Sequence, residues 1–183
     1  MAIITIGGDV GAGKTTLATK LAAALGYKEF YMGRVFRDMA AERNQTIDEF
    51  YISLKDNPEL ERQADERQIK FMKTNDNIVT QGRISYHFAK MHSLPAINVF
   101  IAVAPHVGAL RQSERPEYTG KSIEEITRIS AARVAAEREH YKELYGIEDH
   151  LDKSRFDIVL DTTNLTENQA LEKLLVEIKP RLS

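Results

Sequence analysis

The stretch from Gly8 to Thr15, which reads GDVGAGKT, constrains the fold of this chain more than any other feature. It matches the pattern G-x-x-x-x-G-K-[ST]. The apolar run AIITI at 2–6 precedes it, and a helical pattern over 14–25 follows it. A glycine-rich turn between a strand and a helix directs backbone N–H groups and the positive end of the helix at one spot. The sequence therefore predicts a loop that wraps the phosphates of a nucleoside triphosphate.

Individual residues of this loop have separate expected roles. Lys14 supplies a cation for the β- and γ-phosphates, and the hydroxyl of Thr15 is the expected protein ligand of Mg²⁺. The carboxylate of Asp9 should point away from ATP, because it would repel the phosphates. The residues expected to contact ATP are Gly8, Asp9, Val10, Gly11, Ala12, Gly13, Lys14, Thr15 and Thr16.

Strand and helix patterns alternate along the whole chain. Short apolar runs predict five strands, at 2–6, 27–31, 77–80, 96–104 and 156–162. The segment 33–75 is helical with breaks near Asn44 and at 56–58, and capping boxes start helices at Thr46, Ser122 and Thr166. This pattern predicts an α/β fold, the three-layer P-loop NTPase type with a five-stranded parallel sheet, in one domain over 1–183. Ligands of such a sheet bind at the carboxyl ends of its strands.

The bulk composition excludes several classes of protein. The net charge is −2, which gives no overall basic field for nucleic acid, and the absence of cysteine excludes disulfides and thiolate metal sites. No stretch approaches the ~20 apolar residues of a membrane span. The start MAIITI reads as a strand with no leader signal. We expect a cytoplasmic monomer whose partners are small nucleotides, with no membrane and no nucleic acid among them.

Arginines follow two of the predicted strands. Arg34 and Arg37 come after the second strand, and Arg83 comes after the third. Guanidinium groups bind phosphate bidentately, so arginines beside the phosphate loop favour transfer to a second, anionic substrate over hydrolysis. His87, His92, His106 and His150 are interpreted as surface or hydrogen-bonded residues and not as catalysts.

The polar helix that begins at Ser122 and runs to about Tyr145 leaves two interpretations open. It is either a solvated helix or a mobile lid whose arginines close over phosphates. Arg133, Glu137 and His140 share one face of this helix at helical spacing.

Longer motifs carry a resemblance to a known family. They are GRVFRDMAAERN, NPELERQADERQ, QGRISYHF, LRQSERPEY and, above all, EREHYKELYGIED. With the phosphate loop and FDIVLDTTN they extend over nearly the whole chain. The chain resembles the cytidylate kinase-like proteins of the nucleoside monophosphate kinase group, in particular the short archaeal-type forms and their bacterial relatives.

The resemblance implies a sheet of order 2-3-1-4-5, a helical acceptor-binding insert at about 33–75 and a lid at about 115–138. It implies phosphoryl transfer from ATP, with Mg²⁺, to CMP or dCMP, giving CDP or dCDP and ADP. Arg37 and Arg83 match residues that hold the acceptor phosphate, and Arg138 is a weaker match. Arg111 matches the arginine that stacks on the adenine of the donor. Arg115 and Arg133 match arginines that reach the transferring phosphate.

Two candidates for reading the cytosine base, Asp65 and Arg67, also come from the resemblance, and the alternative for them is a charge pair within one helix.

The chain departs from the family at Gln81, where relatives carry Asp or Glu near the Mg²⁺ shell, and at His140, where Arg or Lys is common. Two other functions stay open. One is a kinase for another nucleoside monophosphate or small molecule, such as an adenylate or shikimate kinase. The other is a catalytically weak nucleotide-binding regulator.

Overall fold

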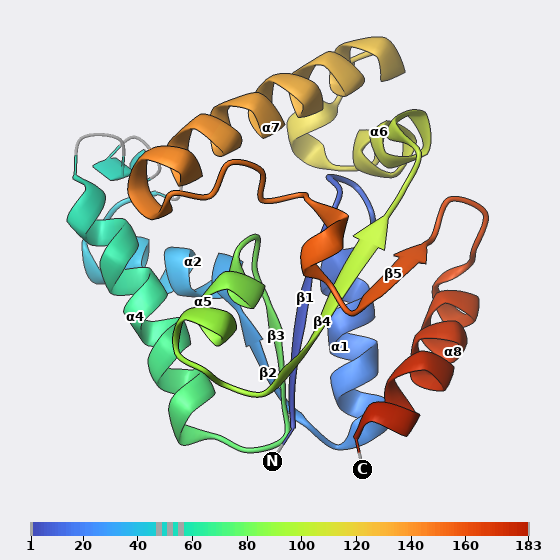
Figure 1. Ribbon diagram of the computed structural model, residues 1–183. Helices are drawn as coiled ribbons and strands as arrows, with labels where there is room; N and C mark the ends of the chain where they lie inside the picture. Colours follow the sequence, from blue (N-terminus) through green and yellow to red (C-terminus); the bar gives the residue numbers. More distant parts are fainter. Residues whose placement is uncertain (1, 47–48, 51–52, 55–56, 183) are drawn as a thin grey trace.

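The computed structural model describes residues 2–46, 49–50, 53–54 and 57–182. Its centre is a parallel five-stranded sheet of order β2-β3-β1-β4-β5 (Figure 1), which confirms the predicted fold and strand order. The strands lie within two residues of their predicted bounds: β1 is Ile3–Gly8, β2 is Lys28–Tyr31, β3 is Ile78–Gln81, β4 is Ala96–Ala102 and β5 is Ile158–Asp161. The buried β-branched residues of β1 suit a strand covered on both faces.

Helices connect the strands and cover both faces of the sheet. Their bounds are Lys14–Leu25 for α1, Met32–Glu42 for α2, Pro58–Thr74 for α4, Ser85–Met91 for α5, Pro105–Ser113 for α6, Ile123–Tyr145 for α7 and Glu167–Ile178 for α8. Short 3₁₀ turns lie at Pro116–Tyr118, Lys153–Arg155 and Lys179–Arg181. Helix α5 was not predicted, because its seven residues are too few for a clear pattern and burial of Phe88 defines its inner face.

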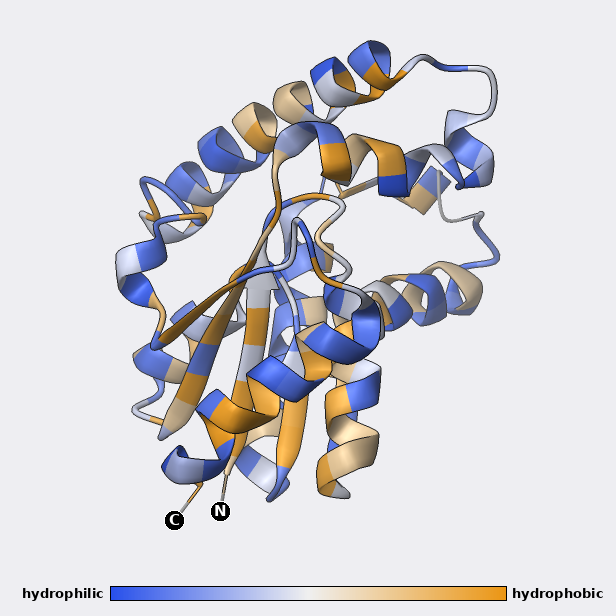
Figure 2. Cartoon of the chain, turned by 90° about the vertical axis from the view of Figure 1, so that its right-hand side faces the viewer, coloured by the Kyte–Doolittle hydropathy of each residue, from blue (hydrophilic) through white to orange (hydrophobic). Residues whose placement is uncertain are grey.

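Two apolar cores lie on opposite faces of the sheet. One packs α1 and α8 against it through Leu17, Leu21, Leu174 and Ile178. The other joins α5 and the end of α4 to the last turn of α7, where Tyr141 is buried. Figure 2 shows the matching hydropathy, with long hydrophobic stretches on the strands and mixed colours on the helices. The sheet is thus fixed on both faces, and its carboxyl edge is left for the site.

The predicted helical insert contains α2 and α4, which share a separate apolar cluster around Met39 and Phe50. The Thr46 hydroxyl accepts from the N–H of Glu49, as the capping box predicts. The predicted break at 56–58 partly falls outside the described residues, and Asn57 caps α4 through its side chain. Phe30 of β2 packs against this third cluster, so the insert lies beside the β2 edge of the sheet.

Helix α7 crosses above the carboxyl ends of the strands (Figure 1). Its predicted capping box forms between Ser122 and Glu125, and only Ile126 and Tyr141 are buried along its length. In the described part of the chain, no helix is both long enough and apolar enough to cross a membrane. The polar length of α7 therefore lies over the site, and its last turn is anchored in the core.

Candidate functional site

The phosphate loop has the backbone shape that its glycines predict. Gly8, Gly11 and Gly13 have φ values of 132°, 77° and 79°. A Cβ on Gly11 would lie 2.3 Å from the carbonyl oxygen of Gly108 in α6, so this position also requires glycine for close approach. The carboxylate of Asp9 accepts a hydrogen bond from the N–H of Val103 at 3.0 Å. Asp9 is therefore turned to the backbone beyond β4, as expected from its charge.

Lys14 begins α1 and closes the loop on itself. Its ammonium group donates to the carbonyl oxygens of Gly8 at 3.0 Å and Asp9 at 2.6 Å. The pKa of Lys14 is lowered to about 8. Burial is the largest cause, and the nearby positive charge of Arg83 is the second. The loop therefore holds a cation whose charge an incoming anion would stabilise.

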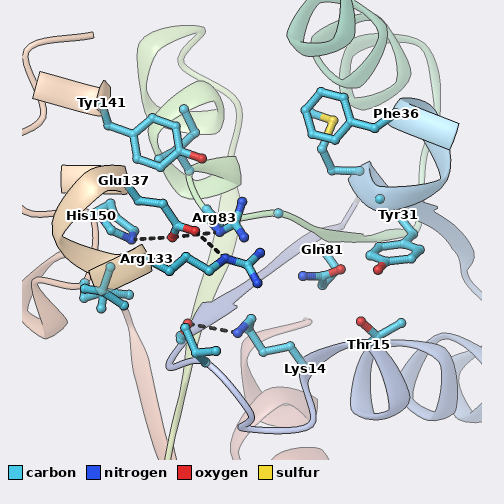
Figure 3. A pocket seen from close by; sticks show the side chains of 18 of the residues that line it. Lys14, Thr15, Tyr31, Phe36, Gln81, Arg83, Arg133, Glu137, Tyr141 and His150 are labelled. Atoms are coloured by element: carbon cyan, nitrogen blue, oxygen red, sulfur yellow. Dashed lines mark hydrogen bonds and ion pairs between the residues drawn. The ribbon is translucent and has the colours of Figure 1, made fainter. Parts of the chain in front are cut away.

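A pocket extends from the phosphate loop to the insert under α7 (Figure 3). Parallel pairing places Gln81 of β3 beside Ile6 of β1, so the residues after both strands meet at one edge. The Oε1 atom of Gln81 is buried without a hydrogen-bond partner among the described residues. Predicted site residues that line this pocket are Gly8, Val10, Gly11, Lys14, Thr15, Asp65, Arg83, Arg115 and Arg133.

Glu137 of α7 lines this pocket and contacts three other lining residues, which the sequence did not predict. Its carboxylate accepts from Arg133 Nε at 2.8 Å and pairs with Arg83 Nε at 2.9 Å. The Nε2 atom of His150 lies 3.4 Å from the same carboxylate. Helical spacing predicted the shared face of Arg133 and Glu137, but the contacts to Arg83 and His150 depend on where α7 crosses the sheet.

His150 corrects one interpretation from the sequence. It is neither on the surface nor fully hydrogen-bonded, because 1% of the side chain is exposed and Nδ1 has no partner among the described residues. The ring packs edge-on against Tyr141 with centroids 5.2 Å apart. His150 is therefore part of the pocket wall behind Glu137.

Polar contacts tie the last turns of α7 to α4 of the insert. The Tyr145 hydroxyl donates to the Asp65 carboxylate, and His140 Nε2 lies 2.6 Å from Glu61 Oε2. Burial raises the pKa of Asp65 to about 7, and the neighbouring charge of Glu61 acts in the same direction. The alternative of a pair between Asp65 and Arg67 does not form, since Arg67 binds Glu42 through two hydrogen bonds.

Three predicted acceptor residues lie outside the lining of this pocket as far as the chain is described. Arg67 is exposed in its pair with Glu42. Arg37 is exposed and lies over the ring of Tyr31, with the guanidinium carbon 5.5 Å from the centroid. Arg138 pairs with Asp149 at 3.0 Å. Their predicted contacts with the acceptor stay predictions.

A second pocket lies on the other side of the phosphate loop. It is lined by Ala12, Gly13, Thr16, Arg111 and Thr162, among others, and it shares Gly11 and Arg115 with the first. Arg111 donates to the Thr162 hydroxyl at 3.1 Å and to its carbonyl oxygen at 2.7 Å. The two pockets therefore meet at the phosphate loop.

Comparison with known proteins agrees with this geometry. The family model for the cytidylate kinase-like family matches residues 3–164. The chain belongs to the cytidylate kinase-like family. Relatives in this family include the cytidylate kinase of Methanopyrus kandleri, which is 34% identical over 98% of this chain and 94% of its own length. The cytidylate kinase of Pyrococcus furiosus is 37% identical over 88% of this chain and 80% of its own.

Solved structures that resemble this chain share its fold at low sequence identity. A shikimate kinase from Bacteroides thetaiotaomicron aligns with a TM-score of 0.68 and 16% identity over 97% of this chain and 98% of that one. An uncharacterized protein from Eubacterium ventriosum aligns with a TM-score of 0.71 and 14% identity over 98% and 99%. These likenesses support the fold alone.

Proposed function

We propose that this protein transfers the γ-phosphoryl group of ATP to CMP or dCMP. Membership of the cytidylate kinase-like family supports this reaction. The observation that carries the proposal is the meeting of two pockets at one phosphate loop, with Gly11 and Arg115 lining both. A hydrolase needs room for one water, whereas a kinase needs two substrate sites that share the transferring phosphate.

The donor occupies the second pocket in this proposal. Its adenine lies near Arg111, and its phosphates follow the loop toward Lys14. Gly11 and Gly13 leave the backbone open to the phosphates, and the start of α1 directs its positive end at them. Arg111 is already held by Thr162, which is compatible with a flat guanidinium stacked on a base.

The acceptor occupies the first pocket. Tyr31, Met32 and Phe36 form an apolar wall at its insert end, which suits a nucleobase. Asp65 lines the same end and offers a carboxyl group to the amino and ring nitrogens of cytosine. Arg67 and Arg37 would have to leave Glu42 and Tyr31, respectively, to bind the acceptor.

Transfer in this site depends on positioning and on positive charge. Lys14, Arg83, Arg115 and Arg133 surround the point where the two substrates would meet. Each is suited to neutralise charge on the transferring group, and the acceptor is already a phosphate oxygen that needs no general base.

The residues present fit a Mg²⁺ ion that is bound mainly by nucleotide phosphates. No group of three or more His, Asp or Glu side chains in the described residues is placed to hold a metal by itself. Thr15, with its hydroxyl, and Gln81, whose Oε1 has no hydrogen-bond partner among the described residues, both line the pocket and offer neutral oxygens. Thr15 and Gln81 would help to hold the ion, which would supply positive charge next to the ATP phosphates.

A coupled ADP-release assay across CMP, dCMP, UMP, AMP and shikimate tests the proposal. We expect turnover with CMP and dCMP well above that with the other acceptors. Turnover with AMP or shikimate alone would mean that this compound, and not CMP, is the acceptor. ATP binding without turnover on any acceptor would favour a regulatory role. The cytoplasmic location and the monomeric state stay predictions, which fractionation and light scattering would test.

A further inference from the structure

The pocket contains one internal anion that contacts the arginines proposed to bind phosphate. Glu137 has 14% of its side chain exposed, and each of its two oxygens faces a different guanidinium group. Oε1 lies 2.8 Å from Arg133 Nε, and Oε2 lies 2.9 Å from Arg83 Nε (Figure 3). The carboxylate therefore bridges the two arginines by their Nε–H groups.

A carboxylate and a phosphate are interchangeable partners for this kind of donor. Guanidinium groups bind both through paired N–H contacts of similar length. Arg83 follows β3 and Arg133 belongs to α7. Two cations repel each other, so Glu137 between them is what holds the two side chains together. Any phosphate that uses these Nε–H groups must take them from Glu137.

We propose that Glu137 is a positioning residue that holds Arg83 and Arg133 together as an internal substitute for the acceptor phosphate and gives them up when that phosphate binds. The inference rests on the proposed function only for the identity of the acceptor. It requires no chemistry at Glu137, since the step is an exchange of ion pairs with no bond made or broken.

His150 gives the displaced carboxylate a partner. Its Nε2 atom is 3.4 Å from Oε2 of Glu137, and the side chain is buried against Tyr141. A small rotation of Glu137 away from the arginines can strengthen this contact, so that the carboxylate is not left buried without a hydrogen bond. The exchange therefore has a defined state for each of the three groups.

The exchange predicts opposite effects on binding and on turnover. The apparent affinity for the acceptor is reduced in proportion to the fraction of time that the arginines are free of Glu137. If Glu137 holds them ~90% of the time, acceptor affinity is roughly tenfold weaker. The same carboxylate competes with the phosphorylated product for the arginines and speeds its release. Removing its charge should therefore tighten acceptor binding and slow turnover.

The first test is E137Q, compared with E148Q as a matched control. Glu148 follows α7 in the chain and pairs with Lys142 of that helix, and 71% of its side chain is exposed, so this control removes the same charge outside the pocket. We expect E137Q to lower the KM for CMP roughly tenfold and to lower kcat by a similar factor. E148Q should change neither. A higher or unchanged KM in E137Q would overturn the proposal, since a merely structural role would weaken binding.

The second test uses the wild-type protein, so that a folding defect in E137Q cannot hide the answer. The ¹⁵Nε–H signals of Arg83 and Arg133 are assigned with the corresponding lysine variants and followed by NMR. Both signals should be protected before ligand is added, and both should shift on titration with inorganic phosphate and with CMP. Signals that keep their position as phosphate saturates the site would overturn the exchange. Shifts with phosphate in a protein that does not phosphorylate CMP would uphold the exchange and refute the proposed acceptor.

Discussion

The hydroxyl of Tyr145 donates a hydrogen bond to the carboxylate of Asp65 and thereby joins the last turn of α7 to α4. Asp65 is the group at this contact whose protonation changes near neutral pH. Its pKa lies at about 7, above the ordinary value of 3.8, because burial disfavours the carboxylate. The helix that covers the site is therefore tied to the insert through a titrating group.

The raised pKa of Asp65 predicts a pH-dependent stability, because burial raises this pKa by more than the hydrogen bond from Tyr145 lowers it. A raised pKa in the folded state means that folding takes up a proton, so the stabilisation is complete below about pH 4 and is lost as the pH rises through about 7. Linkage limits the slope to about 1.4 kcal/mol per pH unit for one proton. Asp65→Asn should flatten the profile of urea unfolding between pH 4 and 7. Asp152→Asn, at an exposed acid whose pKa is lowered by Ser154, should keep the wild-type slope.

Lys14→Ala should remove most transfer activity and leave the fold intact. The ammonium group donates hydrogen bonds to the loop carbonyls of Gly8 and Asp9, and Lys14 lies outside the apolar cluster that packs α1 against the sheet. Loss of its charge from the transferring phosphate should lower kcat by ~10²-fold or more. Steady-state kinetics and urea unfolding measure the two effects. Lys20→Ala on the same helix, which removes an ion pair with Glu167, should keep activity. Near-normal turnover in Lys14→Ala would contradict the electrostatic role.

Lys14 also predicts proton uptake when ATP binds. Its pKa is about 8 before ATP binds, and adjacent phosphates raise it toward the ordinary value of 10.5. Between about pH 8 and 10 the bound form holds more protons than the free form, so ATP affinity should fall as the pH rises through this window. Calorimetry in two buffers of different ionisation enthalpy measures the uptake. Lys14→Met should lose it, and an uptake that survives in this variant would come from another group.

Arg83→Lys should weaken binding and phosphorylation of CMP, although it keeps the positive charge. An ammonium group can still pair with Glu137, but it cannot reproduce the planar fork of a guanidinium. We expect a higher KM for CMP and a kcat lower by about tenfold or more, with ATP affinity unchanged. Kinetics at varied CMP and separate ATP binding check this, with Arg181→Lys as the control on an exposed arginine. Weaker ATP binding with a normal KM for CMP would assign Arg83 to the donor.

Gln81→Glu tests the departure from the family at the end of β3. Gln81 is 7% exposed, lies beside the phosphate loop and has an orphaned oxygen. A carboxylate there can hold a metal-bound water, so we expect a lower Mg²⁺ concentration for half-maximal rate. Mg²⁺ titration at saturating ATP and CMP measures it. A slower enzyme would mean that the new charge repels the acceptor phosphate, and unchanged curves would place residue 81 outside the metal's surroundings.

Local signals in the sequence accounted for most of the fold. Glycines with positive φ, capping pairs such as Ser122 with Glu125, and apolar runs depend on neighbouring residues, so they could be read from the chain alone. The short helix α5 was not predicted, because burial of Phe88 and not a local pattern defines it. The strand order came from the resemblance to the family, and the parallel pairing of the structure confirms it.

The sequence by itself determined the phosphate loop, with Lys14 and Thr15 at the start of α1, because the turn and the helix that form it are local. It also determined that Arg133 and Glu137 share one face of a helix, where the structure shows them paired. Only the tertiary structure decided that Glu137 reaches Arg83 and His150. Those contacts depend on the path of α7 over the sheet, to which the burial of Ile126 and Tyr141 and the contact of Tyr145 with Asp65 all contribute. Long-range packing of this kind leaves no periodic trace in the chain.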